Sequence, residues 1–149
     1  MRFWGLALLV LILDQGSKWF VLQNIERGES IEIIGKVLSF THVQNPGAAF
    51  GFFAYQTWLF IVVTILIGAI IIYYNYRLPA TYKYTHAALG ILLGGAAGNL
   101  IDRIDTGYVI DFISVVFWPP IFNVADMAIV AGIILFIISL WVNEKEVLT

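Results

Sequence analysis

The sequence predicts an integral membrane protein, mainly α-helical, with four transmembrane helices and a small extracytoplasmic β-sheet or loop between the first two. Two observations lead to this prediction. Of the 149 residues, 60% are apolar and only 12% are charged, whereas an ordinary soluble domain has about 25% charged residues. Four segments also contain the roughly 20 mostly apolar residues that a transmembrane helix needs. We therefore expect a single polytopic membrane domain over residues 1–149.

The same composition excludes several classes of protein. Eight Lys and Arg residues face ten Asp and Glu residues, so the chain lacks the basic excess that is typical of a nucleic-acid binder. It contains no cysteine, which excludes a disulfide framework, a thiol nucleophile and a cysteine-ligated metal centre. The H-E-x-x-H and G-x-S-x-G motifs are absent as well. This inventory argues against a metalloprotease site.

The four expected spans differ in character, and they cover residues 3–22, 57–76, 85–101 and 121–142. The first follows Arg2 and begins like a signal peptide, but no small-x-small cleavage site follows its apolar run. It is interpreted as a retained span. The second is uninterrupted. In the third, Gly90, Gly94 and Gly98 form two overlapping G-x-x-x-G steps, which favour close packing between helices.

Four spans place both termini on the same side of the membrane. Basic residues favour the cytoplasmic side, and the side of the termini holds four of them: Arg2, Arg77, Lys83 and Lys145. The other side holds three, which are Arg27, Lys36 and Arg103. We therefore expect cytoplasmic termini. Residues 23–56 and 102–120 then form two outer loops.

The first outer loop carries the signals of a small sheet. Apolar and polar residues alternate over 31–33 and 38–41, with a Gly-Lys pair between them, which predicts two strands joined by a turn. Asn45, Pro46 and Gly47 form a turn signal. The apolar and aromatic stretch from 48 to 55 is expected to lie on the membrane surface.

Charged residues inside apolar spans are informative because each costs about 2.5–3.5 kcal/mol to insert. Asp14 and Lys18 stand four residues apart, in the order that favours an ion pair on a helix. They are either a structural salt bridge or an anchor for an active site. Asn99, Asp102 and Arg103 share one helix face at the outer end of the third span. Two interpretations stay open there: an exposed Asp102–Arg103 pair, or support of a site.

Two further carboxyl groups are the strongest candidates for chemistry. Asp111 lies in the second outer loop, and Asp126 lies about five residues inside the fourth span, three after Asn123. The prolines at 119–120 are expected to break the chain between them, so that the two segments fold toward each other. Adjacent carboxyls share a proton, and such a pair can activate a water and protonate a leaving amine. The alternative is a buried structural Asp paired with Arg103 or Lys18.

Five short blocks carry a resemblance to a known family. They read D-Q-G-S-K from Asp14, N-P-G-A-A-F from Asn45, G-N-L-I-D-R from Gly98, G-Y-V-I-D-F from Gly107 and F-N-V-A-D from Phe122. In this order, at these spacings and on a four-span chain, they resemble the bacterial lipoprotein signal peptidases (signal peptidase II) over nearly the whole length. Pro46 and Met127 depart from the pattern, at positions that are not essential to it.

The resemblance implies an aspartic endopeptidase that needs neither metal nor cofactor. Such an enzyme removes the signal peptide from diacylglyceryl-modified prolipoproteins, cutting just before the lipidated cysteine, near the outer face of the bacterial inner membrane. It is inhibited by globomycin, a lipopeptide that resembles the substrate, and a monomer is expected. The catalytic pair corresponds to Asp111 and Asp126. The residues expected to bind substrate or support the site are Asp14, Lys18, Asn45, Gly47, Asn99, Asp102, Arg103, Val109 and Asn123.

Two other functions are compatible with charged groups in a membrane. A small ion-coupled carrier would use them as a proton relay, but the sequence shows no inverted repeat and no matching pair of broken helices. A scaffold protein would use them only to pair helices. In that case Asp→Asn changes at Asp111 and Asp126 would alter stability and no catalytic turnover.

Overall fold

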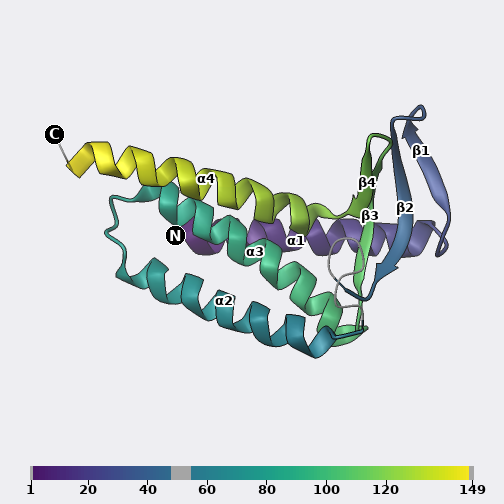
Figure 1. The fold of residues 1–149 in the computed structure, drawn as a ribbon, viewed down its shortest axis with the longest axis horizontal. Helices are drawn as coiled ribbons and strands as arrows, with labels where there is room; N and C mark the ends of the chain where they lie inside the picture. The colour runs from purple at the N-terminus through teal and green to yellow at the C-terminus, as the bar shows by residue number, and fades with distance from the viewer. Residues whose placement is uncertain (1, 48–54, 148–149) are drawn as a thin grey trace.

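The computed structural model describes residues 2–47 and 55–147 of the chain. Its elements are α1 (Arg2–Asn24), β1 (Ser30–Ile34), β2 (Leu38–Asn45), α2 (Thr57–Arg77), α3 (Lys83–Asp105), β3 (Val109–Val115), β4 (Trp118–Phe122) and α4 (Val124–Val147). The four helices run side by side, and the sheet lies across one end of them (Figure 1). α1 begins and α4 ends at the opposite end, which agrees with an even number of spans (Figure 1).

Within the described residues, four helices are long and apolar enough to cross a membrane, and the membrane-crossing part of α4 is Val124–Val142. The predicted spans are thus confirmed as helices, and two of the helices differ from the approximate bounds by three or four residues at one end. α3 continues to Asp105 instead of ending at 101, and α4 begins at Val124 instead of 121. The helix α3 does not end where its sequence becomes polar, because the polar side chains at its end are hydrogen-bonded within a buried network.

The sheet is larger than the sequence predicted. Its four strands are antiparallel in the order β1-β2-β3-β4, so half of it comes from the second outer loop, whereas we had expected the sheet in the first loop alone. Pro119 and Pro120 lie inside β4 and do not break the chain there. They are tolerated because β4 is an edge strand, which pairs only with β3. The hairpin turn comes earlier, between Val115 and Trp118.

In the first outer loop both predicted strands are present, and both are longer than expected: β1 covers Ser30–Ile34 and β2 covers Leu38–Asn45. The long β2 pairs with β3 as far as Asn45 and Val109. It therefore carries the first loop to the centre of the sheet. The membrane-surface segment that we expected at 48–55 lies, except for Tyr55, outside the described residues.

α3 is the helix around which the others pack, and its glycines make this possible. A Cβ atom on Gly94 would lie 2.8 Å from the Cβ of Val10 in α1, and one on Gly90 would lie 3.1 Å from the Cα of Phe3. On another face of α3, a Cβ on Gly95 would lie 2.7 Å from the carbonyl oxygen of Ala125 in α4. The predicted close packing through glycine is therefore confirmed, because no side chain fits at these crossings.

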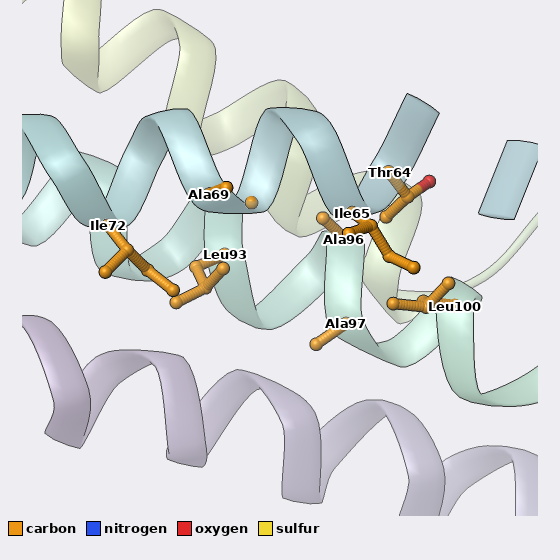
Figure 2. A pocket seen from close by; sticks show the side chains of 9 residues that line it. Thr64, Ile65, Ala69, Ile72, Leu93, Ala96, Ala97 and Leu100 are labelled. Carbon is orange, nitrogen blue, oxygen red and sulfur yellow. The ribbon is translucent and has the colours of Figure 1, made fainter. Parts of the chain in front are cut away.

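α2 packs more loosely and contacts the bundle through α3, which lies between α2 and α4 (Figure 1). Ile71 is its only residue classed as buried within the described chain. A small apolar cavity of about 290 Å³ separates the two helices; Figure 2 shows Ile72 of α2 and Leu93 and Ala96 of α3 among its lining side chains. Near the sheet α2 is held more firmly, because the Thr57 hydroxyl donates to the carbonyl of Gly107 at 2.7 Å.

We expect Gly90→Ala to lower the thermal stability of the purified protein in detergent. The added methyl group meets the backbone of Phe3, so α1 and α3 must move apart, and overpacking of this kind costs about 1–3 kcal/mol. The matched control is Gly5→Ala in α1, because nothing lies within 4 Å of a Cβ at that position. A Gly90→Ala variant with the same melting temperature as the Gly5→Ala control would contradict the close packing of α1 against α3.

Candidate active site

The centre of the site is a buried ammonium group on α1. Lys18 is 2% exposed, and its Nζ lies 2.8 Å from a carboxylate oxygen of Asp14 and 2.8 Å from one of Asp102. It also donates to the side-chain oxygen of Asn99 at 2.9 Å. All three donors of the ammonium are thus used. The predicted Asp14–Lys18 pair is present, and it extends to two residues of α3.

Asp14 links α1 to α4 as well. Its Oδ1 accepts the backbone N–H of Ala125 at 2.9 Å, so it satisfies one of the free amides at the start of α4. The carboxylate also contacts the backbone at Gly98, where a Cβ would collide with it. The glycine at this position therefore lets the charged group of α1 approach α3. Both interpretations of the Asp14–Lys18 pair still apply, because it is a structural salt bridge and also lies beside the candidate site.

Gln15 is a member of this network that the sequence analysis passed over. Its Nε2 donates to Asp102 Oδ1 at 2.9 Å and to the carbonyl oxygen of Gly98 at 3.2 Å. Asp102 in turn accepts the backbone N–H of Ile110 at 3.1 Å, which holds β3 against α3. The only signal for Gln15 was its place between Asp14 and Lys18, because one amide in a helix has no distinctive spacing.

The start of α4 is closed by a reciprocal pair of hydrogen bonds. The Asn123 side-chain oxygen accepts the backbone N–H of Asp126 at 2.9 Å, and a carboxylate oxygen of Asp126 accepts the backbone N–H of Asn123 at 3.2 Å. This is the arrangement of a capping box, with Asn and Asp in place of the usual Ser or Thr and Glu. It fixes Asp126 in the first turn of α4, where the helix dipole favours a negative charge.

Asp111 reaches the same point from the central strand β3. It is 3% exposed, and it accepts hydrogen bonds from Asn123 Nδ2 at 2.7 Å and from Asn45 Nδ2 at 2.9 Å. Burial raises the pKa of Asp111 from 3.8 to about 6, and the nearby charge of Asp126 also raises it, while the two amide hydrogen bonds lower it. Asp111 and Asp126 thus share Asn123 as a common partner.

Asn99 connects the buried ammonium to the second carboxyl group. Its Nδ2 donates to Asp126 Oδ1 at 2.8 Å, while its Oδ1 accepts from Lys18 at 2.9 Å and from Asn123 at 3.1 Å. Asn99 is 8% exposed, so these bonds are largely shielded from water. A continuous chain of hydrogen bonds therefore runs from α1 through α3 to α4.

Arg103 and the turn after β2 form another wall of the site. The guanidinium donates to the carbonyl oxygens of Gly47 at 3.1 Å and Asn99 at 3.3 Å, and it lies 4.7 Å from the centre of the Phe60 ring. Gly47 donates its N–H to the side-chain oxygen of Asn45 at 3.0 Å. Since Asn45 pairs with Val109 in the sheet, it lies diagonally opposite Asp111 on the same face.

The structure excludes two of the interpretations that the sequence left open. Asp102 is 7% exposed and pairs with Lys18, so the expected alternative of an exposed Asp102–Arg103 pair is wrong. Among the described residues, the salt bridges join Lys18 only to Asp14 and Asp102. Asp111 and Asp126 are therefore not held by direct ion pairs; amides hold them.

Both carboxyl groups open into a cavity of about 890 Å³. Its polar end is lined by Asn45, Gly47, Asn99, Arg103, Asp111 and Asp126, with Val109 beside them. Its other wall continues down one apolar face of α4, where Met127, Val130, Ala131 and Ile134 follow one another at helical spacing. This apolar wall was not singled out from the sequence, because α4 is apolar on all sides. The cavity thus joins a carboxyl pair to a surface at membrane depth.

Known proteins resemble this chain in sequence and in fold. Residues 6–142 match the family model described as signal peptidase (SPase) II. A lipoprotein signal peptidase of Moorella thermoacetica is 50% identical over 135 residues, which cover 91% of this chain and 89% of that protein. One of Syntrophomonas wolfei is 46% identical over 146 residues, which cover 98% and 97%.

A solved structure also matches closely. It is described as a bacterial membrane enzyme, and it superposes with a TM-score of 0.87 at 35% identity, covering 95% of this chain and 88% of its own. Both the sequence match and the fold extend over almost the entire chain. The chain therefore belongs to the signal peptidase II family.

Proposed function

We propose that the protein is an aspartic endopeptidase that removes the signal peptide from diacylglyceryl-modified prolipoproteins, cutting just before the lipidated cysteine. The observation that carries this proposal is the position of Asp111 and Asp126. They come from a strand and a helix start, share Asn123 as a hydrogen-bond partner and line one cavity. The lipoprotein signal peptidase names of its relatives support the substrate class.

The pair has the properties that peptide hydrolysis needs. One carboxylate takes a proton from an attacking water, and the other carboxylic acid donates a proton to the reacting peptide group. The two carboxyls must hold different protonation states at the same pH, and two neighbouring acids achieve this by sharing one proton. Arg103 lies close enough to act electrostatically on both of them, and its guanidinium can hold a substrate carbonyl at the polar end of the cavity.

The shape of the cavity fits a substrate that remains partly in the membrane. A signal peptide is an apolar helix, and a diacylglyceryl group stays among the lipid chains. The apolar face of α4, which includes Val130 and Ile134, extends the cavity toward membrane depth. A scissile bond at the end of such a helix would then lie beside Asp111 and Asp126, where α4 meets the sheet (Figure 1).

We place the protein in the bacterial inner membrane with cytoplasmic termini, so the sheet and the carboxyl pair lie near the outer face. It acts as a monomer, and lipopeptides of the globomycin type occupy the same cavity as the substrate. The supporting residues Asp14, Lys18, Asn45, Asn99 and Asp102 act through hydrogen bonds to one another or to the pair.

We expect Asp111→Asn and Asp126→Asn each to reduce cleavage of a diacylglyceryl-modified prolipoprotein by about 10²–10⁴-fold, which is the contribution of a general acid or base. The measurement is single-turnover cleavage by purified protein in lipid. Asp105→Asn is the matched control, because Asp105 is an exposed residue at the end of α3. Folded variants that still cut at the normal rate would mean that the catalytic carboxyls are elsewhere.

We also expect kcat/KM to fall as the pH rises through about 6, where Asp111 loses the shared proton in the free enzyme. Asn45 donates to the ionised form of Asp111, so Asn45→Ala removes a bond that lowers this pKa. Because a hydrogen bond to a charged group contributes about 1.5–3 kcal/mol, the alkaline limb should move up by about one to two pH units.

Ser30→Ala is the control for this shift, since Ser30 is exposed and bonds to Thr41 in the middle of β2, on the side of β1. A pH–rate profile whose alkaline limb is unchanged in Asn45→Ala would exclude Asp111 as the group that titrates. An alkaline limb that moves to lower pH would contradict the expected effect of the Asn45 hydrogen bond on the pKa of Asp111.

A further inference from the structure

We propose that the hydrogen-bond network assigns different roles to the two aspartates, so that Asp126 is the carboxylate that activates water and Asp111 is the acid that carries the shared proton. The inference rests on the proposed peptidase function and goes beyond it, because the pair alone is compatible with either assignment. Asn99 is the positioning residue that this proposal adds. Its side-chain oxygen accepts a hydrogen bond from Lys18, and its NH₂ group therefore donates one to Asp126.

The orientation of the Asn99 amide is fixed by its neighbours. An ammonium group can only donate, so the Asn99 atom that faces Lys18 must be the oxygen. Asn123 Nδ2 donates to the same oxygen at 3.1 Å. The Asn99 NH₂ group is then directed at Asp126 Oδ1, which must accept. A buried positive charge thus keeps a donor directed at one particular carboxyl group.

The orientation of Asn123 is fixed in the same way, by the helix start. Its Oδ1 accepts the backbone N–H of Asp126, so its Nδ2 must donate. The NH₂ group has two hydrogens for three acceptors, which are Asp111 Oδ1, Asn99 Oδ1 and the carbonyl of Ile110. Asp111 therefore receives a shared donor. The donor from Asn99 to Asp126, by contrast, has no second acceptor among the described residues.

The two carboxyls also differ in what else surrounds them. Asp126 accepts a backbone N–H in the first turn of α4, and a helix start stabilises a negative charge. It is half-buried and keeps contact with the cavity. Asp111 lies in a strand, is 3% exposed and receives its bonds from the neutral amides of Asn45 and Asn123. A negative charge is thus better stabilised on Asp126, and the shared proton belongs on Asp111.

The charged groups around the pair come from α1 and α3. Lys18 of α1 is the positive end of the chain through Asn99 and also acts electrostatically on Asp111, and Asp14 balances its charge together with Asp102 of α3. From α3, Arg103 acts on both members of the pair. The described parts of β2, β3 and α2 add no further charged side chain to the bonds of the two carboxyls.

The assignment gives a balanced reaction. The water oxygen bonds to the scissile carbonyl carbon while one of its protons passes to Asp126, and Asp111 gives its proton to the carbonyl oxygen. The tetrahedral intermediate then collapses: the carbon–nitrogen bond breaks, the proton on Asp126 passes to the leaving nitrogen, and Asp111 takes back a hydroxyl proton. The products are a carboxylic acid and an amine, and both aspartates end as they began.

Infrared difference spectroscopy can show which of the two aspartates is protonated, and it needs no substrate. At pH 5, we expect the protonated-carboxyl band of the wild type to disappear in Asp111→Asn and to remain in Asp126→Asn. A band that survives in Asp111→Asn, or that is lost in Asp126→Asn, overturns the assignment. Because this readout needs no cleavage, a protein that shows the expected bands but never cuts the prolipoprotein would refute the proposed function and not the assignment.

Asn99→Asp tests the positioning role through the pH profile. The introduced carboxylate keeps the size of the asparagine side chain and still accepts from Lys18, so the contact that joins α1 to α3 is kept. A carboxylate cannot donate to Asp126, and it regains this ability only when protonated. We therefore expect kcat at neutral pH to fall at least 10-fold with little change in KM, and the optimum to move to lower pH.

The matched control is Asn24→Asp, because Asn24 is exposed and, within the described residues, its amide bonds only to the carbonyl of Phe20 in the same helix. It should leave the rate and the pH optimum unchanged. An Asn99→Asp variant with the wild-type optimum overturns the role of Asn99. If this variant does not fold, the infrared spectra of the two aspartate variants still decide the assignment.

Discussion

The rest of the site depends on one buried positive charge. An unpaired ammonium cannot remain inside a protein at acceptable cost, and removing one partner from a buried charge pair typically costs about 3–5 kcal/mol. Lys18 must therefore keep Asp14, Asp102 and Asn99 around it. These partners belong to two helices, and Asp14 also caps a third, α4, at Ala125. Satisfying one charge thus brings α1, α3 and α4 into the register that the carboxyl pair requires.

The glycines of α3 are the steric counterpart of this electrostatic constraint. Gly98 leaves the space that the Asp14 carboxylate occupies, and Gly95 lets the start of α4 lie against α3. The same crossing places Asn99 one residue further along, within reach of Asp126. Close packing and polar bonding therefore act at the same level of the bundle. Neither would position the carboxyl pair alone, since the packing sets the helix distance and the bonds set the rotation.

How much could be predicted from the sequence depended on the range of the interaction. The spans, the Asp14–Lys18 pair and the glycine steps follow from spacing within one helix, and the structure bears them out. β3 was missed because its first residues are buried on both faces, so polar and apolar residues do not alternate there. β4 was missed because it contains prolines, which an edge position tolerates. Gln15 and the direction of the Asn99 amide were not predictable, because both depend on partners more than 80 residues away in the chain.

The physical problem of a peptidase in a membrane is to hold water and charge beside lipid. In this fold the two requirements are separated along one cavity. Its apolar wall on α4, including Val130, needs no polar partner, whereas the polar end is held by side chains whose bonds are already directed. Asp111 and Asp126 lie at the boundary between these two environments, because one comes from the sheet and the other from the first turn of α4. Under the proposed function, the depth at which α4 starts would set where along a membrane-bound substrate a bond is cut.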